Sequence, residues 1–190
     1  MYVTPSRLPP RALALVEDCA RRAVAALGLT RGPIHAEFRV NARGPWVLEV
    51  QARPIGGLCA RALRFGAEKM PLEELLVRHA MGIATRGLER EAAASGVMMI
   101  PVPASGILEG VGGIEEATHL PGVESVEITA RMHDYIAAWP EGASYLGFIF
   151  ARAPEPAVVE SSLRAAHACL RFDLRPRLPV EHPASHHMSR

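Results

Sequence analysis

Lysine is almost absent from this chain of 190 residues, in which Lys69 is the only lysine among 21 basic residues. Aromatic residues are also sparse, at 5%. Because 20 acidic residues balance the basic ones, the formal net charge is only +1. Proteins that bind nucleic acids or anionic membranes usually carry a basic excess on one face. We therefore expect neither a nucleic-acid partner nor a membrane partner.

Cysteine is scarce as well. Cys19, Cys59 and Cys169 lie far apart without a Cys-x-x-Cys spacing, so neither a disulfide framework nor a zinc site is indicated. The sequence also lacks a signal-peptide pattern and an uninterrupted apolar run of about 18 residues. With 49% hydrophobic residues the chain can still bury a core in one or two domains. We expect a soluble, cytoplasmic protein with reduced thiols.

The most informative stretch is a predicted β-hairpin over residues 33–53. Side chains alternate between the two faces of a strand, and apolar and polar residues alternate here in the same way. The apolar sets are Ile34, Ala36, Phe38 and Val40, then Trp46, Leu48 and Val50. The polar sets are His35, Glu37, Arg39 and Asn41, then Glu49, Gln51 and Arg53, with Val47 as the exception.

The register of this hairpin follows from matching the two apolar sets on one face. A three-residue turn, Ala42-Arg43-Gly44, satisfies that condition. It sets Glu37 directly across from Glu49 and His35 across from Gln51. Two carboxylates that face each other at about 5 Å destabilise a sheet, unless a positive charge lies between them.

Two interpretations of this acidic pair are open. It is either a solvated sheet face, with arginines that screen the acids, or a site for a divalent cation. Two carboxylates and an amide oxygen are hard ligands of the kind that Mg²⁺ takes alongside phosphate oxygens. The guanidinium of Arg53 adds a fork suited to a phosphate group. The spacing therefore indicates a site for a metal-bound nucleotide.

These motifs resemble a known family. They are Tyr2-Val-Thr-Pro-Ser-Arg-Leu-Pro, a helix that ends in Ala-Leu-Gly-Leu, Gly32-Pro-Ile-His-Ala-Glu-Phe-Arg, and Leu48-Glu-Val-Gln-Ala-Arg-Pro-Ile-Gly-Gly. Together they are similar to the C-terminal half of the ATP-grasp domain of carboxylate–amine ligases. The nearest likeness is to the L-amino acid ligases, and biotin carboxylase is more distant. The resemblance covers about residues 1–90 well and the remainder more loosely.

The resemblance implies roles for individual residues. An acid on each hairpin strand binds the Mg²⁺ (or Mn²⁺) carried by ATP, which implies Glu37 and Glu49 as metal ligands. Gln51 stands where the family often has Asn and would be a further metal and nucleotide ligand. His35 would lie beside the nucleotide. Arg53, as the catalytic residue, would hold the transferred phosphate or an acyl-phosphate intermediate on the way to an amide.

The expected fold class is α+β: the C-terminal part of an ATP-grasp fold, an antiparallel sheet flanked by helices, followed by a small α+β domain. We assign residues 1–95 to the ATP-grasp part, 96–176 to the closing domain and 177–190 to a flexible tail. Besides the hairpin, the expected strands are 97–102, 106–111, 123–130, 145–151 and 172–174. The expected helices are 9–27, with its apolar stripe in the core, then 58–69, 71–82, 113–120 and 156–170.

The sequence contains no glycine-rich phosphate loop motif, and its one lysine, Lys69, follows the hairpin. In ATP-grasp enzymes a glycine-rich loop and lysines that contact the phosphates come from the half of the domain that precedes the hairpin. We therefore expect a fragment or split subunit that is inactive alone and meets ATP and its carboxylate and amine substrates through a missing half. The alternative is a non-catalytic interaction or regulatory module. Because the hairpin edge has few blocking charges, we expect a homodimer or a complex with the missing half.

Overall fold

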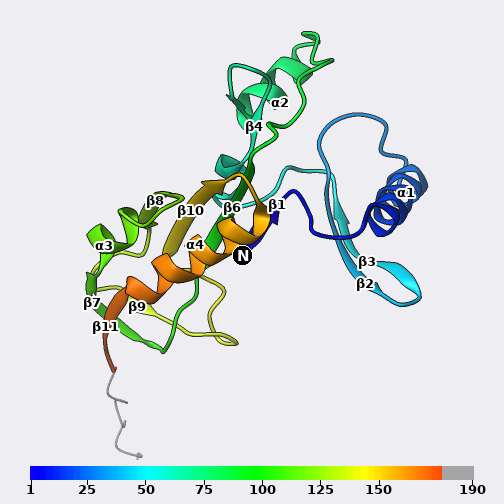
Figure 1. The fold of residues 1–190 in the computed structure, drawn as a ribbon. Coiled ribbons are helices and arrows are strands. Elements are labelled where there is room, and N and C mark those ends of the chain that lie inside the picture. Colours follow the sequence, from blue (N-terminus) through cyan, green and yellow to red (C-terminus); the bar gives the residue numbers. More distant parts are fainter. Residues whose placement is uncertain (177–190) are drawn as a thin grey trace, which may run out of the picture.

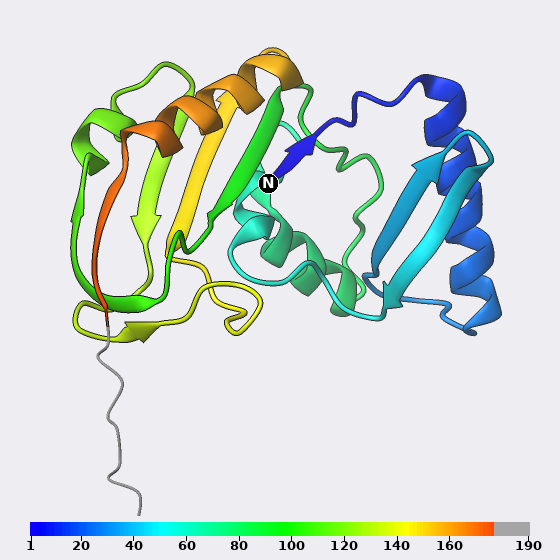
Figure 2. The ribbon, with the colours of Figure 1, turned by 90° about the horizontal axis from the view of Figure 1, so that it is seen from below.

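The computed structural model describes residues 1–176, and the tail expected from residue 177 lies outside them. One end of the molecule is a hairpin unit, made of helix α1 (Pro10–Ala26) and strands β2 (His35–Asn41) and β3 (Gly44–Gln51). The other end, the sheet unit, consists of β1 (Tyr2–Thr4) and residues 94–175, with a long helix lying across its strands (Figures 1 and 2). The expected α+β fold class is confirmed.

Helix α1 packs along β3 and β2 and forms as predicted. A proline occupies its first turn, where the missing amide proton is tolerated, and Gly28 follows its end with a positive φ of 68°. The prediction that its apolar stripe is core was wrong. No residue of α1 is buried, and Leu27 is 57% exposed, because the helix is covered on one side only, by a two-stranded sheet.

The hairpin has the predicted register at its acidic end and a different one at its tip. His35 pairs with Gln51 and Glu37 with Glu49, but Phe38 pairs with Val47, so Leu48 is the extra residue of a β-bulge. The turn accordingly has two residues, not the three predicted. The Asn41 side chain stabilises the tight turn, because its Oδ1 accepts a hydrogen bond from the amide of Arg43 at 2.9 Å.

The middle segment, residues 59–93, departs from the prediction of a long helix over 58–69. That stretch contains a short 3-10 helix, η1 (Cys59–Ala62), and a two-residue strand, β4 (Arg64–Phe65). A tight turn replaces the rest, since Gly66 has a φ of 67° and accepts a hydrogen bond from the amide of Lys69 at 3.2 Å. The elements are η1 (Cys59–Ala62), β4 (Arg64–Phe65), β5 (Met70–Pro71) and α2 (Leu72–Ala80). The helix expected after Pro71 is confirmed.

The sheet unit contains nearly all strands and helices expected there. Its elements are β6 (Ala94–Ile100), β7 (Gly106–Gly112), α3 (Ile114–Thr118), β8 (Val123–Ile128), β9 (Tyr135–Ile136), β10 (Gly147–Ala153), α4 (Pro156–Cys169) and β11 (Arg171–Arg175). They form a four-stranded sheet in the order β1-β6-β10-β8 and a three-stranded sheet in the order β11-β7-β9. Helix α4 packs on β6 and β10 and closes a core that includes Ile100, Leu108, Ile149 and Leu163, all 0% exposed.

Strand β1 joins the beginning of the chain to the sheet unit. Tyr2 pairs with Val97 and Thr4 with Ser95, antiparallel to β6. The four-stranded sheet therefore takes strands from both sides of the boundary expected between residues 95 and 96, and β6 itself begins at Ala94. The division of the chain at that point stays a prediction.

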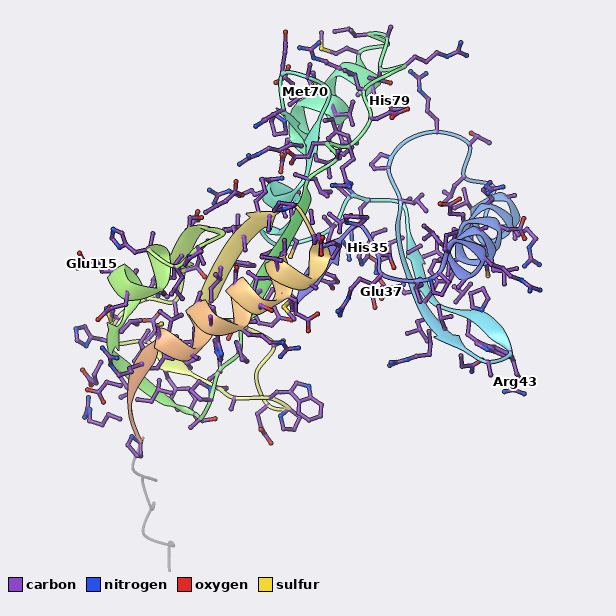
Figure 3. The ribbon with its side chains drawn as sticks, in the orientation of Figure 1. His35, Glu37, Arg43, Met70, His79 and Glu115 are labelled. Atoms are coloured by element: carbon purple, nitrogen blue, oxygen red, sulfur yellow. The ribbon has the colours of Figure 1, made fainter. Side chains whose placement is uncertain are left out.

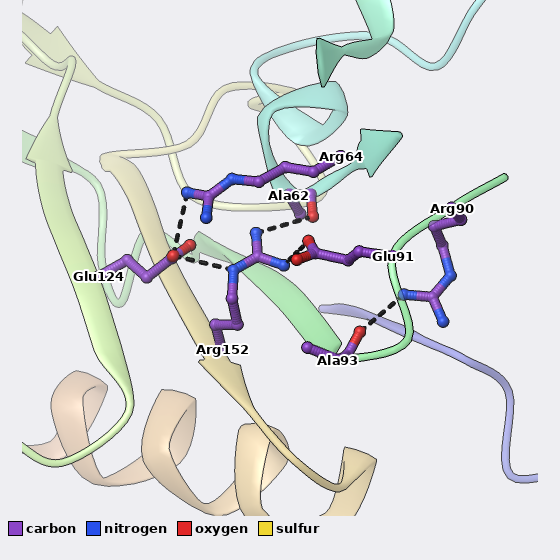
Figure 4. A network of polar contacts seen from close by, with 7 residues as sticks. All are labelled: Ala62, Arg64, Arg90, Glu91, Ala93, Glu124 and Arg152. Carbon is purple, nitrogen blue, oxygen red and sulfur yellow. Dashed lines mark hydrogen bonds and ion pairs between the residues drawn. The ribbon is translucent and has the colours of Figure 1, made fainter. Parts of the chain in front are cut away.

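An ion-pair network fixes the middle segment to the sheet unit (Figure 4). Arg152 on β10 pairs with Glu91 and, at 2.9 Å, with Glu124 on β8. Glu124 also pairs with Arg64 at 3.0 Å, and the Arg152 guanidinium donates to the carbonyl of Ala62 at 3.3 Å. Since the side chains of Arg152 and Glu91 are only 13% and 11% exposed, most of this network is shielded from water.

None of the helices within residues 1–176 combines the length and the apolar character needed to cross a membrane.

Candidate functional site

The polar face of the hairpin carries the predicted acidic pair. Glu37 and Glu49 are direct cross-strand partners, and His35 and Gln51 form the neighbouring pair on the same face. His35 Nε2 lies 3.1 Å from Glu37 Oε1, a hydrogen bond that holds the carboxylate in place. The His35 side chain is 15% exposed and that of Glu37 is 46% exposed, so the pair sits at the boundary between protein and solvent.

The second strand of the hairpin contributes acceptors that other protein groups leave free. Glu49 and Gln51 are both half-buried. Within residues 1–176 neither side chain makes a hydrogen bond or an ion pair. No cluster of three or more histidine, cysteine or acidic residues forms a complete metal cage in that part of the chain. The donor set is therefore two carboxylates and an amide, which would leave most coordination positions to phosphate and water oxygens.

Arg53 lies just beyond the end of β3, at the start of a loop that crosses to the sheet unit. Its Nη1 donates to the carbonyl of Pro54 at 2.9 Å, which restrains the side chain and leaves other guanidinium protons available. Gly57 has a φ of 61°, and a Cβ there would lie 3.5 Å from the ring of Phe148. The loop therefore runs close against β10, and a glycine allows its left-handed backbone.

A cavity of about 210 Å³ lies where the hairpin meets the sheet unit. His35, Glu37 and Arg53 line its polar side. Met99 of β6 and Phe148 of β10 line its apolar side. Figure 3 shows His35 and Glu37 on the side of the hairpin that faces the sheet unit, while Arg43 lies at the far tip. The hairpin thus contributes charged groups to the lining of the cavity, and the sheet unit contributes large apolar ones.

A larger cleft of about 850 Å³ adjoins this cavity along β2. Tyr2, His35 and Glu37 line both spaces. Leu48, the bulged residue, lines the cleft but not the smaller cavity. Glu49 and Gln51 are absent from both linings. The structure therefore brings His35, Glu37 and Arg53 together around one cavity. Glu49 and Gln51 do not line it, although they are the cross-strand partners of Glu37 and His35.

Burial and charge act on the hydroxyl of Tyr2 at the wall of the cavity. Burial raises the pKa of Tyr2 above its ordinary value, and the neighbouring Glu37, Cys59 and Tyr145 raise it further. Burial also raises the pKa of the Cys59 thiol. Both groups consequently stay protonated near neutral pH, and Tyr2 can donate a hydrogen bond into the cavity.

Sequence reasoning missed the residues that close this cavity opposite the hairpin. Four come from the sheet unit, Tyr2, Met99, Tyr145 and Phe148, and one from the middle segment, Cys59. No local pattern brings the four next to the hairpin, because their positions depend on the pairing of β1 with β6 and of β6 with β10.

Two family models match the chain, one in each part. The ATP-grasp domain model matches residues 1–62, which include the whole hairpin and Arg53. The model of L-amino acid ligase C-terminal domain 2 matches residues 98–175, which comprise most of the sheet unit.

Solved structures of ligases share the same fold. The L-amino acid ligase from Bacillus licheniformis superposes with a TM-score of 0.77 at 26% identity, over 92% of this chain and 44% of that protein. The phosphoribosylglycinamide synthetase from Anaerococcus prevotii superposes with a TM-score of 0.72 over 91% of this chain and 44% of that protein. At 13% identity, the second likeness shows the fold alone.

A curated relative, the uncharacterized protein y4rH from Sinorhizobium fredii (strain NBRC 101917 / NGR234), is 25% identical over 166 residues, which are 87% of this chain and 34% of that protein. The chain thus spans about a third of this relative and less than half of each ligase. Its fold and both family matches identify it as a relative of the ATP-grasp ligases, with an ATP-grasp part followed by an L-amino acid ligase C-terminal domain.

Proposed function

We propose that this chain contributes the metal- and phosphate-binding half of an ATP-dependent ligase that joins a carboxylate to an amine through an acyl phosphate. Glu37, Glu49 and Gln51 bind the Mg²⁺ or Mn²⁺ that accompanies ATP. Arg53 binds the transferred phosphate, and His35 holds Glu37 in position beside the nucleotide. One observation carries the proposal: Glu37 and Glu49 are direct cross-strand partners, and Glu37 lines the same cavity as Arg53.

The acidic pair has little structural reason to exist without a cation. Like charges directly opposite each other destabilise a sheet, and His35 is the only hydrogen-bond partner of either carboxylate within residues 1–176. The oxygen donors fit Mg²⁺, which usually takes one or two carboxylates and completes its shell with phosphate and water oxygens. When bound, the metal would offset the negative charge of the phosphates.

Arg53 is suited to the phosphate that moves. Its guanidinium is always charged and can bind two oxygens of a phosphate or acyl phosphate at once. It lines the cavity of about 210 Å³ together with Glu37 and His35. Charge neutralisation by fixed donors contributes most of the catalysis in phosphoryl transfer. The apolar wall of Met99 and Phe148 would hold the organic part of the substrate.

The other half of the nucleotide clamp would have to supply a glycine-rich loop and lysines, because these 190 residues contain no such loop and their one lysine, Lys69, follows the hairpin. We therefore expect no turnover from these residues by themselves. A non-catalytic module derived from the same fold would also be inactive alone. The two functions differ in metal binding, because a module that no longer uses ATP has no need of the acidic pair.

A titration with Mn²⁺ tests the proposal. Paramagnetic broadening of NMR signals should centre on residues 35–39 and 49–53. The double variant Glu37→Ala/Glu49→Ala should weaken Mn²⁺ binding by about tenfold or more, because affinity follows the number of charged ligands. A matched control is Glu17→Ala/Asp18→Ala, which removes two exposed acids from α1 in the same unit. Equal broadening in all three proteins would overturn the proposal.

We further propose that the open hairpin recruits another chain, either a second copy or the half that completes the clamp. Within residues 1–176, β2 and β3 pair only with each other, and the segment before Pro10 pairs with β6 instead of capping the hairpin. Trp46, Val47 and Leu48 are 48%, 42% and 60% exposed. Unpaired edges and exposed apolar surface favour association.

Light scattering at micromolar concentration tests this association. The chain has a mass of 20.5 kDa, and a self-associating hairpin should give twice that value. Leu48→Glu should shift the mass toward the monomer, since it charges the exposed bulge. The matched control is Met81→Glu, at a position 70% exposed beyond α2, which should leave the mass unchanged. A single monomeric species in all three would contradict a homodimer and leave the complementing half to be tested by mixing.

A further inference from the structure

A cavity of about 360 Å³ lies between α1, the loop that leads from α1 into β2, and the C-terminal end of α2. We term it the α1–α2 cavity. Val24, Leu29 and Ile34 contribute apolar side chains to its lining, and Arg31 and His79 contribute ionisable ones. Among residues 1–176 no acidic residue lines it. The cavity therefore presents apolar surface together with a positive charge that no carboxylate in the lining offsets.

Arg31 and His79 have hydrogen-bond donors that the protein leaves available. Arg31 Nη2 donates to the carbonyl of His79 at 3.4 Å, a long contact that uses one of the five N–H groups of the guanidinium. In the part of the chain that the structure describes, Arg31 has no ion pair with a carboxylate, and the His79 ring makes no hydrogen bond or ion pair. Both residues line the cavity and neither is buried, so a ligand can reach them.

The α1–α2 cavity lies behind the base of the hairpin, on the side away from the candidate site. Ile34 and Ala52 line it, whereas their chain neighbours His35 and Arg53 line the cavity of about 210 Å³. Neighbouring residues of an extended chain face opposite sides. A ligand in the α1–α2 cavity would thus contact the back of the same backbone that carries His35 and Arg53.

The α1–α2 cavity also lies between two parts of the molecule. Arg31 belongs to the loop before β2 and His79 to α2, and Figure 3 shows His79 on the side of the middle segment nearest that loop. Within residues 1–176 the contact from Arg31 to the His79 carbonyl is the only hydrogen bond between this loop and α2. A ligand that binds both side chains would therefore strengthen a weak connection between the hairpin unit and the middle segment.

We propose that the α1–α2 cavity binds a small organic monocarboxylate with an apolar body. The guanidinium fork of Arg31 donates to both carboxylate oxygens, and the His79 ring donates to one of them. The apolar body packs on Val24, Leu29 and Ile34. One arginine offsets one negative charge, so a monocarboxylate fits better than a phosphate group, which carries up to two.

The volume of the α1–α2 cavity sets the size of the ligand. A dry apolar cavity of about 150 Å³ holds benzene, so a cavity of about 360 Å³ has room for two fused rings and a carboxylate. The inference does not rest on the proposed ligase function, because the residues assigned to that function lie outside this lining. The two can therefore succeed or fail independently.

The probes 2-naphthoate and 2-naphthamide are matched, since they share the fused rings and differ in the charge of the head group. Binding to the full chain is measured at neutral pH by methyl NMR titration. Naphthoate should bind saturably, shift the methyl signals of Val24, Leu29 and Ile34, and bind more tightly than naphthamide. Arg31→Gln should weaken naphthoate binding by about five- to tenfold, the range for a charge-assisted hydrogen bond at a partly exposed site, and leave naphthamide binding unchanged.

Two further variants locate the effect. Arg43→Gln removes an arginine at the far tip of the hairpin, where its guanidinium lies 5.1 Å from the centroid of the Trp46 ring, and should leave naphthoate binding unchanged. Arg53→Gln should also leave it unchanged, because Arg53 lines the other cavity. The proposal is overturned if naphthoate does not bind saturably, if naphthamide binds as tightly, if Arg31→Gln and wild type bind naphthoate equally, or if Arg53→Gln is the variant that weakens it.

Discussion

The two ends of this molecule are both built on antiparallel strands, yet they differ completely in burial. In β6, six of seven residues are buried, and β10 has five buried residues. In α1, β2 and β3 none is buried. All buried residues described by the structure lie at or after Cys59.

This contrast separates the part of the molecule that supplies its stability from the part that carries the proposed site. The sheet unit buries both faces of its central strands, one under α4 and the other under η1, so it supplies most of the hydrophobic stabilisation. The hairpin unit instead displays its ionisable face and leaves several large apolar side chains exposed. A half-covered hairpin is suited to be completed by a ligand or another chain, whereas the sheet unit is suited to hold it in place.

The largest expected effect compares one substitution in the two regions. Leu163→Ala, at a side chain that is 0% exposed on α4, should lower the free energy of unfolding by about 3 kcal/mol, since deletion of a buried leucine leaves a cavity. Leu48→Ala, at a side chain 60% exposed in the hairpin, should change it by less than about 0.5 kcal/mol. Urea unfolding followed by circular dichroism measures both. Similar losses of unfolding free energy at the two positions would contradict the difference in burial between the sheet unit and the hairpin unit.

The next effect concerns the network that holds the middle segment on the sheet unit. Arg152→Met should cost about 3 kcal/mol of unfolding free energy, because it leaves the shielded carboxylate of Glu91 without its cation. In this variant Glu124 still has a cation beside it, because Arg64 lies 3.0 Å away. The double variant Arg152→Met/Glu91→Leu should recover much of that loss, since no unpaired charge remains.

The exposed pair of Arg78 and Glu74 on α2 is the control for this network. Arg78→Met should cost only about 0.3–0.5 kcal/mol, as is typical of exposed pairs four residues apart. If Arg152→Met lowered the free energy of unfolding no more than Arg78→Met does, the network would not anchor the middle segment.

The acidic part of the hairpin could be predicted from the sequence, because period-two alternation fixes both the faces and the register of a strand. The tip could not. Asn41 stabilises a turn of two residues instead of three, so the second strand has one residue more than the first. That residue, Leu48, is unpaired and forms the bulge. The roles of Glu49, Gln51 and Arg53 as ligands stay predictions, since they depend on a nucleotide.

In the sheet unit the short apolar runs were sufficient to predict the strands and helices except the two-residue β9 (Tyr135–Ile136), but not which strands pair. The pairing of Tyr2–Thr4 with β6 joins residues about 90 positions apart, and no local pattern encodes it. The cavity and the adjoining cleft of the candidate site depend on that pairing. The helix predicted over 58–69 was wrong because its helix-forming residues are outweighed by the turn at Gly66 and by the contact of Cys59 and Ala62 with the sheet.

The smallest expected effect is a pH dependence inside the sheet unit. Hydrogen bonds from Arg175 at 2.8 Å and from His133 at 3.2 Å favour the charged form of Glu109, and they lower its pKa below the ordinary value of 4.5. A lowered pKa contributes stability that is present above the ordinary value and is lost as the pH falls through the folded value.

Wild type should therefore be slightly more stable than Glu109→Gln at neutral pH, and the difference should shrink below about pH 4.5. Urea midpoints measured from pH 7 to about pH 3 test this, with Arg175→Gln as the matched variant that removes the main cation and should converge with wild type over the same interval. A difference that grows on acidification would show that Glu109 is not held in its charged form, and the link between β7 and β11 would then depend on backbone pairing alone.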